Sequence, residues 1–177
     1  MWTVLATLAM ALGLTVGLTT TAQAATYYNL VNYKAGKCMS LAGGGSTTNG
    51  TNVVIYTCND DAAEQRWYLV ESGAYPGWYY IKNAKAGADQ CISVADGGST
   101  AKGAAMILWT CTGGEEQRWR FADEGGGWAE IQNYKSGHYM SLDDNGSTAN
   151  NTRVIQWSWV TPGPEQVWGL APAVIDA

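Results

Sequence analysis

The sequence contains one short motif three times: AEQRW at 63–67, EEQRW at 115–119 and PEQVW at 164–168. The shared Glu-Gln-x-Trp recurs at intervals of 52 and 49 residues. Upstream of each copy, a block of 21 residues aligns with its counterparts without a gap; the blocks are 38–58, 91–111 and 139–159. Repetition at this spacing indicates an array of similar structural units.

A second match extends each unit toward its start. The segments VNYKAGK, KNAKAGA and QNYKSGH occupy 31–37, 82–88 and 132–138. A unit of about 50 residues therefore occurs three times and fills most of the chain. We place the copies at about 27–76, 77–126 and 127–170.

The local signals within each unit are those of β structure. Short runs of β-branched and aromatic residues, VVIYTC, MILWTC and VIQWSW, end the three blocks. Each run follows a pair that tolerates positive φ in a hairpin turn: Asn49-Gly50, Lys102-Gly103 and Asn150-Asn151. No segment keeps a helical period over ten residues or more. We expect three or four short strands per unit and little helix.

Three β units of this size favour a closed arrangement with pseudo-threefold symmetry. A propeller typically needs four or more blades, and an open solenoid leaves edges that need caps. Closure removes the edges and lets each unit bury its apolar face against the other two. The repeated Trp67, Trp119 and Trp168 are then equivalent core anchors. The Gln of each motif is expected to bond nearby backbone or site groups.

The N-terminal segment predicts export. Residues 2–18 form an uncharged apolar run, and Ala22-x-Ala24 follows in a stretch of small residues. This pattern is typical of a secretory signal peptide at 1–24, which leaves a secreted domain at 25–177. No Lys or Arg precedes the run, so an uncleaved membrane anchor is the competing interpretation; the shortness of the run disfavours it.

The amino-acid composition limits the classes of molecule that the protein is expected to bind. The net charge is −5 and only 14% of residues are charged, which argues against a nucleic-acid or anionic-membrane partner. Nine Trp, ten Tyr and 22 Gly suit a β protein that meets a neutral, hydroxyl-rich ligand. The alternative is that the aromatic residues only form a core. We expect a monomer.

The repeat selects one pairing of the four cysteines. Cys38 and Cys58 are 20 residues apart, and so are Cys91 and Cys111. In the third unit both equivalent positions change together, to Tyr139 and Trp159. Two positions that lose cysteine as a pair are bonded as a pair in the other units, so we predict the disulfides 38–58 and 91–111. Aromatic packing replaces the bond in the third unit.

The sequence favours no catalytic or metal centre. His138 is the only His, it has no equivalent in the other units, and a Ser-His-Asp site would depend on it alone. A C-x-x-C pair and paired His are both absent, so we predict no metal and no cofactor. Threefold repetition fits several equivalent weak binding sites better than one active centre. We therefore predict that the protein is not an enzyme.

These motifs together resemble the ricin B-type β-trefoil lectins, which are also a carbohydrate-binding module family of secreted hydrolases. The resemblance covers about residues 27–170 and rests on C-[MI]-S-[LV] in the first two units, with Y-M-S-L from Tyr139 in the third, and on G-S-T-x-x-[GN] and Q-x-W in every unit. It implies a β-trefoil of twelve strands, with a six-stranded barrel and a triangular cap of hairpins. It also implies metal-independent binding of galactose-type or xylan-type sugars in up to three shallow pockets.

The resemblance assigns candidate sugar-binding residues unit by unit. An aromatic platform for ring stacking matches Tyr56, Trp109 and Trp157, since a ring face suits the apolar face of a pyranose. The Gln of Q-x-W matches Gln65, Gln117 and Gln166. The family's Asp after the Cys-hydrophobic pair is replaced by Ser40, Ser93 and Ser141, and its Gln two residues before the aromatic by Val54, Ile107 and Ile155.

A second difference from the family pattern suggests another residue that could supply the missing carboxylate. The Asn that the family commonly has before the motif Gln is Glu64, Glu116 and Glu165 here. Our hypothesis is that this Glu accepts bonds from sugar hydroxyls, since a charged acceptor makes the stronger bond. Alternatively, it only pairs with surface cations such as Arg66 or Arg118. Asp96 and Asp143 lie in the following loops and are further candidates.

Two other classes stay open. The missing Asp and Gln favour a β-trefoil interaction protein that no longer binds sugar, or a trefoil protease inhibitor. An enzyme would need an acidic cluster in one unit that the others lack. A heparin-binding growth factor is disfavoured, because heparin requires a basic patch.

Overall fold

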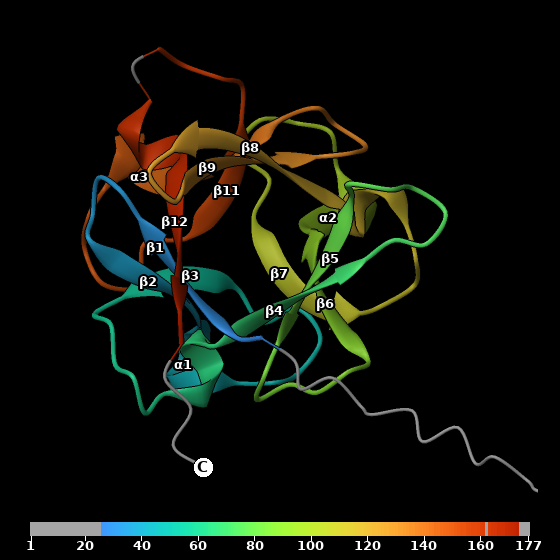
Figure 1. The fold of residues 1–177 in the computed structure, drawn as a ribbon, viewed down its shortest axis with the longest axis horizontal. Coiled ribbons are helices and arrows are strands. Elements are labelled where there is room, and N and C mark those ends of the chain that lie inside the picture. The colour runs from blue at the N-terminus through green and yellow to red at the C-terminus, as the bar shows by residue number, and fades with distance from the viewer. Residues whose placement is uncertain (1–25, 162, 174–177) are drawn as a thin grey trace, which may run out of the picture.

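The computed structural model describes residues 26–161 and 163–173; the predicted signal peptide at 1–24 lies outside them. This described part contains twelve strands (Figure 1). Their bounds are β1 (Tyr28–Asn32), β2 (Lys37–Leu41), β3 (Val53–Tyr56), β4 (Trp67–Glu71), β5 (Tyr79–Asn83), β6 (Gln90–Val94), β7 (Met106–Thr110), β8 (Trp119–Gly125), β9 (Trp128–Asn133), β10 (Tyr139–Leu142), β11 (Val154–Trp157) and β12 (Val167–Pro172).

The helical segments are short. They are α1 (Ala42–Gly45), α2 (Ala95–Gly98) and α3 (Asp143–Gly146), with three 3₁₀ turns, η1 (Ala63–Gln65), η2 (Glu115–Gln117) and η3 (Pro164–Gln166). Within the described residues, no helix is long and apolar enough to cross a membrane.

Six strands close into a barrel. Antiparallel pairing runs from β1 to β4, β5, β8, β9 and β12, and β12 then pairs with β1 through the register Tyr28↔Pro172 to Asn32↔Trp168. Figure 1 shows β12 in red beside β1 in blue, where the two ends of the domain meet. Closure leaves the barrel without an open edge, as predicted for three units that bury their apolar faces together.

Three hairpins cap one end of the barrel. They are β2–β3, β6–β7 and β10–β11, one from each unit. Single bridges join each hairpin to the other two: Asn52↔Ile107, Ala105↔Ile155 and Val54↔Arg153. The predicted hairpin turns are also present, because Gly50, Gly103 and Asn151 have φ of 88°, 83° and 68°. The all-β trefoil with pseudo-threefold symmetry is confirmed.

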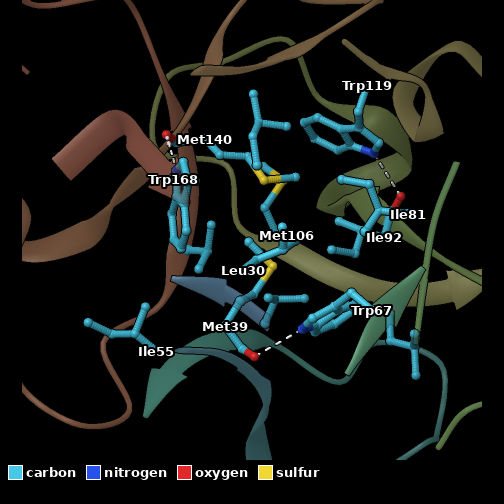
Figure 2. Close-up of a cluster of buried hydrophobic side chains, with 14 of the residues drawn as sticks. Leu30, Met39, Ile55, Trp67, Ile81, Ile92, Met106, Trp119, Met140 and Trp168 are labelled. Atoms are coloured by element: carbon cyan, nitrogen blue, oxygen red, sulfur yellow. Dashed lines mark hydrogen bonds between the residues drawn. The ribbon is translucent and has the colours of Figure 1, made fainter. Parts of the chain in front are cut away.

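The three motif tryptophans are the centre of the core. Trp67, Trp119 and Trp168 are each 0% exposed, and Figure 2 shows their indoles around a shared cluster of aliphatic and methionine side chains. Each indole N–H donates to a carbonyl on the cap hairpin of its own unit, at 3.0–3.2 Å; the acceptors are Met39, Ile92 and Met140. The tryptophan thus fills the core and also fastens barrel to hairpin, since a buried indole N–H needs an acceptor.

Both predicted disulfides are present. They join Cys38 to Cys58 and Cys91 to Cys111. In the third unit the rings of Tyr139 and Trp159 pack at 5.4 Å, which confirms that aromatic contact replaces the bond there.

One buried polar pair breaks the symmetry of the core. Gln156 occupies the position of Ile55 and Leu108, and it is 0% exposed. Its Nε2 donates to the carbonyls of Ser99 and Ala101 at 2.8 Å, and its Oε1 accepts from Ser136 Oγ at 2.8 Å. Ser136 itself stands where the other units have Ala35 and Ala86. Both members of the pair are therefore polar in the third unit and apolar in the first and second.

We expect Gln156→Leu to lower the free energy of unfolding by about 1–3 kcal/mol. The substitution leaves the Ser136 hydroxyl without this acceptor and removes the two hydrogen bonds that the Gln156 amide donates. Adding Ser136→Ala should recover part of that loss, with a coupling energy of about 1 kcal/mol. Urea denaturation of the two single variants and the double variant measures this. Strictly additive effects would contradict the pairing.

Candidate functional site

Each unit carries one surface pocket beside its hairpin. The pockets of the first, second and third units have volumes of about 550, 370 and 470 Å³. Each is bounded by the hairpin, by the turn at α1, α2 or α3, and by the Glu of the motif. Residues that the sequence analysis assigned from separate motifs thus come together in three equivalent places.

Strand alternation builds the aromatic wall. On β3, Val53 and Ile55 are 0% exposed and point into the core, so Val54 and Tyr56 lie on the opposite face and line the pocket. Tyr56, Trp109 and Trp157 are 44%, 41% and 40% exposed. All three predicted platforms are therefore accessible to a ligand.

The serines that replace the family's Asp form part of the floor. Ser40, Ser93 and Ser141 line the three pockets, and each is only 4–5% exposed. Each lies opposite an apolar residue of the partner strand, as in the Ser40↔Val54 pair. The floor is therefore small and mostly apolar, with one hydroxyl.

A left-handed turn faces the platform in every pocket. In the first unit Gly43 and Gly44 have φ/ψ of 64°/35° and 69°/32°, and Gly45 has φ 79°. The third unit puts Asp144 and Asn145 in the same conformation, which short polar side chains tolerate better than others. A Cβ at Gly45 would lie 2.9 Å from the Cβ of Glu64, so glycine lets the turn approach the motif.

The motif glutamines lie behind the pockets. Gln65, Gln117 and Gln166 are at most 3% exposed. In the first unit Oε1 accepts from the Asn59 N–H at 2.8 Å and Nε2 donates to the Thr57 carbonyl at 3.0 Å. The other two units repeat both bonds. The glutamine thus bonds backbone, as the sequence suggested, and holds the loop that follows the platform strand.

The motif glutamates line the pockets and meet a cation from the next unit. Glu64 pairs with Lys85 at 3.6 Å, and Glu165 pairs with Lys34 at 3.7 Å. The partners are not Arg66 and Arg118, which the alternative interpretation had named: these guanidinium groups donate to the carbonyls of Asp60 and Gly113. An ion pair at this partial exposure contributes only about 0–1 kcal/mol of stability.

The second unit arranges its glutamate differently. The carboxylate of Glu116 lies against Gly114, at a place that a Cβ on that residue would occupy. The first unit has Ala62 at this position, which blocks the arrangement. Lys135 still approaches the turn and donates to the Gly97 carbonyl at 3.5 Å. The three pockets therefore share their parts without being identical.

The two further acidic candidates also lie at the pockets. Asp96 lines the pocket of the second unit with φ 55°. Asp143 lines that of the third unit, but its Oδ2 accepts from Arg153 Nε at 3.0 Å and Nη2 at 2.5 Å. Asp143 is therefore already engaged by a cation.

Neighbouring units contribute contacts around the pockets, which the sequence analysis missed. Lys85 belongs to the second unit but pairs with Glu64 of the first. Asn83, also of the second unit, donates from Nδ2 to the Glu64 carbonyl at 2.9 Å. Asn151, from the third unit, also lines the first pocket. Its equivalents lie beside the platforms of the other two pockets: Gly50 beside Trp109 and Gly103 beside Trp157. The Lys shared by all three K-[AS]-G segments was the available signal.

These observations define a class: a closed β-trefoil with three equivalent shallow pockets, each with an exposed ring over a mostly apolar floor. The family model described as the ricin-type beta-trefoil lectin domain matches residues 26–168. The chain belongs to this family, which supports a carbohydrate-binding role.

One curated relative matches part of the chain. Volkensin from Adenia volkensii is 26% identical over 110 residues, which are 62% of this chain and 18% of that protein. The chain thus matches less than a fifth of that relative.

Two solved structures are similar at higher identity. The designed threefold-symmetric protein ThreeFoil has a TM-score of 0.74 at 32% identity, covering 82% of this chain and 97% of its own. The exo-β-1,3-galactanase 1,3Gal43A from Clostridium thermocellum has a TM-score of 0.76 at 33% identity, covering 83% of this chain and 30% of the enzyme.

Proposed function

We propose that this protein is a secreted, non-enzymatic lectin or carbohydrate-binding module with up to three weak, metal-independent sugar sites. The observation that carries the proposal is the solvent-exposed ring of Tyr56, Trp109 or Trp157, repeated in three pockets of the same construction. An exposed aromatic ring beside a pocket offers a stacking surface to a pyranose ring.

The polar groups around the ring provide the hydrogen bonds. In the third pocket Glu165, Ser141 and Asn145 lie on the walls, so a sugar stacked on Trp157 meets a carboxylate, a hydroxyl and an amide. One stacked ring with three or four bonds corresponds to a dissociation constant near 1 mM, about −4 kcal/mol. Three such sites on one rigid body raise the avidity for a polymer by roughly 10²–10⁴.

We propose galactose-type or xylan-type glycans as ligands. The galactanase relative supports the first class, because its name assigns it to β-1,3-galactan. The first pocket should differ in preference, since it has the smaller Tyr56 and adds Asn151 from the third unit.

The Glu–Lys pairs favour one alternative. A carboxylate that already pairs with Lys34 or Lys85 is a poorer acceptor for sugar hydroxyls. Such pairing is compatible with a trefoil that acts through protein contacts or protease inhibition. A screen of glycans and polysaccharides, with and without chelator, beside a protease-inhibition assay separates the two functions. Inhibition of a protease without binding of any glycan would contradict the lectin proposal.

Glu165→Gln is expected to weaken sugar binding at the third pocket about five- to tenfold, because an amide is a weaker acceptor than a carboxylate. Titration of sugar against the Trp157 indole N–H signal measures this. Glu115→Gln is the matched control, since Glu115 is exposed and does not line these pockets. If Glu165→Gln and Lys34→Gln lower the melting temperature equally while sugar affinity stays unchanged, the glutamate serves only the ion pair.

A further inference from the structure

A second kind of site lies on the outer face of the barrel, where two units meet. At each of the three junctions one residue of the motif lies opposite a residue of its own unit's first strand. Its carbonyl accepts a backbone N–H of the next unit: Arg66 from Ala84, Arg118 from Tyr134 and Val167 from Tyr33. Val167 is opposite Glu130, and Arg118 is opposite Tyr80, one step along from Tyr79↔Trp119. The third junction places Arg66 opposite Asn29, one step along from Tyr28↔Trp67. Two junctions thus contain an arginine, and one contains a valine beside an acid.

The junction between the second and third units shows what this place accommodates. The guanidinium of Arg118 lies 4.1 Å from the ring centre of Tyr75 and 5.6 Å from that of Tyr134. Its Nε donates to the Tyr80 hydroxyl at 3.4 Å, and its Nη2 donates to the Gly113 carbonyl at 2.7 Å. Tyr134 also meets Trp78 edge to face, at 4.8 Å and 85°. A guanidinium therefore fills an aromatic slot.

The junction between the third and first units keeps part of this slot without the guanidinium. Gly125 stands three residues before Trp128, where Tyr75 precedes Trp78, and Glu130 stands at the position of Tyr80. Tyr33 and Trp128 are the equivalents of Tyr134 and Trp78, and they meet at 4.9 Å and 90°. Because Val167 replaces the arginine, a cavity of about 380 Å³ is open at this place. Its lining is Tyr33, Glu124, Gly125, Trp128, Trp159, Gly163, Pro164 and Val167. Tyr33 and Trp159 are 57% and 38% exposed, so a ligand can reach the rings.

The charges at this cavity complement a cation. Glu124 lines the cavity, and Glu130 is the cross-strand neighbour of Val167 at only 8% exposure. Burial raises the pKa of Glu130 to about 7, and the adjacent carboxyl of Glu124 adds to the rise. Neither residue takes part in any of the ion pairs found among residues 26–161 and 163–173. The junction at Val167 thus has two carboxyl groups near the position that the Arg118 guanidinium occupies at the preceding junction.

We propose that this cavity binds a guanidinium group of a ligand, in the position that Arg118 occupies at the preceding junction. The rings of Tyr33, Trp128 and Trp159 provide faces for a cation–π contact. The planar guanidinium matches a carboxylate with two parallel hydrogen bonds, which Glu124 on the cavity wall can accept. Glu130, opposite Val167, adds negative charge nearby when it is ionised. The site is independent of the three sugar pockets.

Methylguanidinium titrated into the purified protein tests the proposal. We expect saturable shifts of the Trp128 and Trp159 indole N–H signals, with a dissociation constant on the order of 1–10 mM. Methylurea has the same shape without charge and should bind at least tenfold more weakly. Equal binding of the two compounds, or no saturable shift with methylguanidinium, would overturn the proposal.

Two variants locate the site. Val167→Arg supplies a tethered guanidinium, as Arg118 does, and should abolish binding of methylguanidinium. Glu124→Gln should weaken binding at least threefold, while Asp89→Asn, which removes an exposed charge outside the cavity, should leave it unchanged. The indole signals of the buried Trp67, Trp119 and Trp168 report that each variant is folded. Undiminished binding to folded Val167→Arg, or equal loss in Asp89→Asn, would contradict the assignment.

Binding should also depend on pH through Glu130. The titratable group beside it is Glu124 on β8, whereas β12 contributes Val167, which has no charge. Glu130 is mostly protonated below about pH 7, so methylguanidinium should bind more tightly at pH 8 than at pH 5.5. Glu130→Gln should remove most of this change. An unaltered pH profile in that variant would assign the effect to other groups and remove Glu130 from the site.

Discussion

Replacing Trp119 by alanine is expected to lower the free energy of unfolding by about 3–5 kcal/mol. The indole is 0% exposed and packs against apolar side chains from all three units. Its loss leaves a cavity and also removes the bond to the Ile92 carbonyl at 3.2 Å. Urea denaturation followed by circular dichroism measures the effect.

Trp109→Ala is the matched control, because it removes the same side chain from a position that is 41% exposed. We expect this control to cost about 1 kcal/mol or less. A similar cost for the two variants would show that the Trp119 position does not anchor the shared core.

Removing all three platforms, by Tyr56→Ala, Trp109→Ala and Trp157→Ala together, is expected to abolish detectable binding to a polymeric glycan. Each truncation removes the stacking surface of one pocket, and the combined loss also removes the gain of roughly 10²–10⁴ from multivalency. Each single variant should keep partial binding. Affinity electrophoresis or a pull-down with an insoluble polysaccharide measures the difference.

Tyr33→Ala is a control for general loss of surface aromatics, since Tyr33 is 57% exposed and lies outside the three pockets. It should bind the polysaccharide as the unmodified protein does. If the triple variant retained full binding while Tyr33→Ala lost it, the sugar would bind at the outer cavity and the proposed pockets would be wrong.

Repetition is the reason that so much of the fold was predictable. A motif found once is ambiguous, but Trp67, Trp119 and Trp168 constrain each other because equivalent positions need equivalent environments. The same logic paired the cysteines, since Tyr139 and Trp159 replaced both partners together. The three platforms came from the family resemblance instead; their exposure is explained by strand alternation, since the preceding residue of each strand points into the core.

What sequence reasoning missed depends on contacts between units. The alignment treats each copy as self-contained, so it suggested Arg66 and Arg118, adjacent to the motif Gln, as partners of the glutamates. The closed ring instead brings Lys34 and Lys85 from the following units. The missing Cβ at Gly114 makes room for the Glu116 carboxylate, but Gly163 also lacks a Cβ while Glu165 pairs with Lys34, so the residue type at this position does not by itself set the arrangement.

The joint between β12 and β1 differs from the other two because no peptide bond crosses it. Hairpins connect β4 to β5 and β8 to β9 within continuous chain, whereas the last joint depends on ladder bonds alone. The third pocket lies beside this joint: Lys34, which follows β1, contacts Glu165 and the Asn145 carbonyl, two residues that line the pocket. A ligand bound in this pocket orders the residues that Lys34 contacts across the joint, so its occupancy should stabilise the joint against local opening.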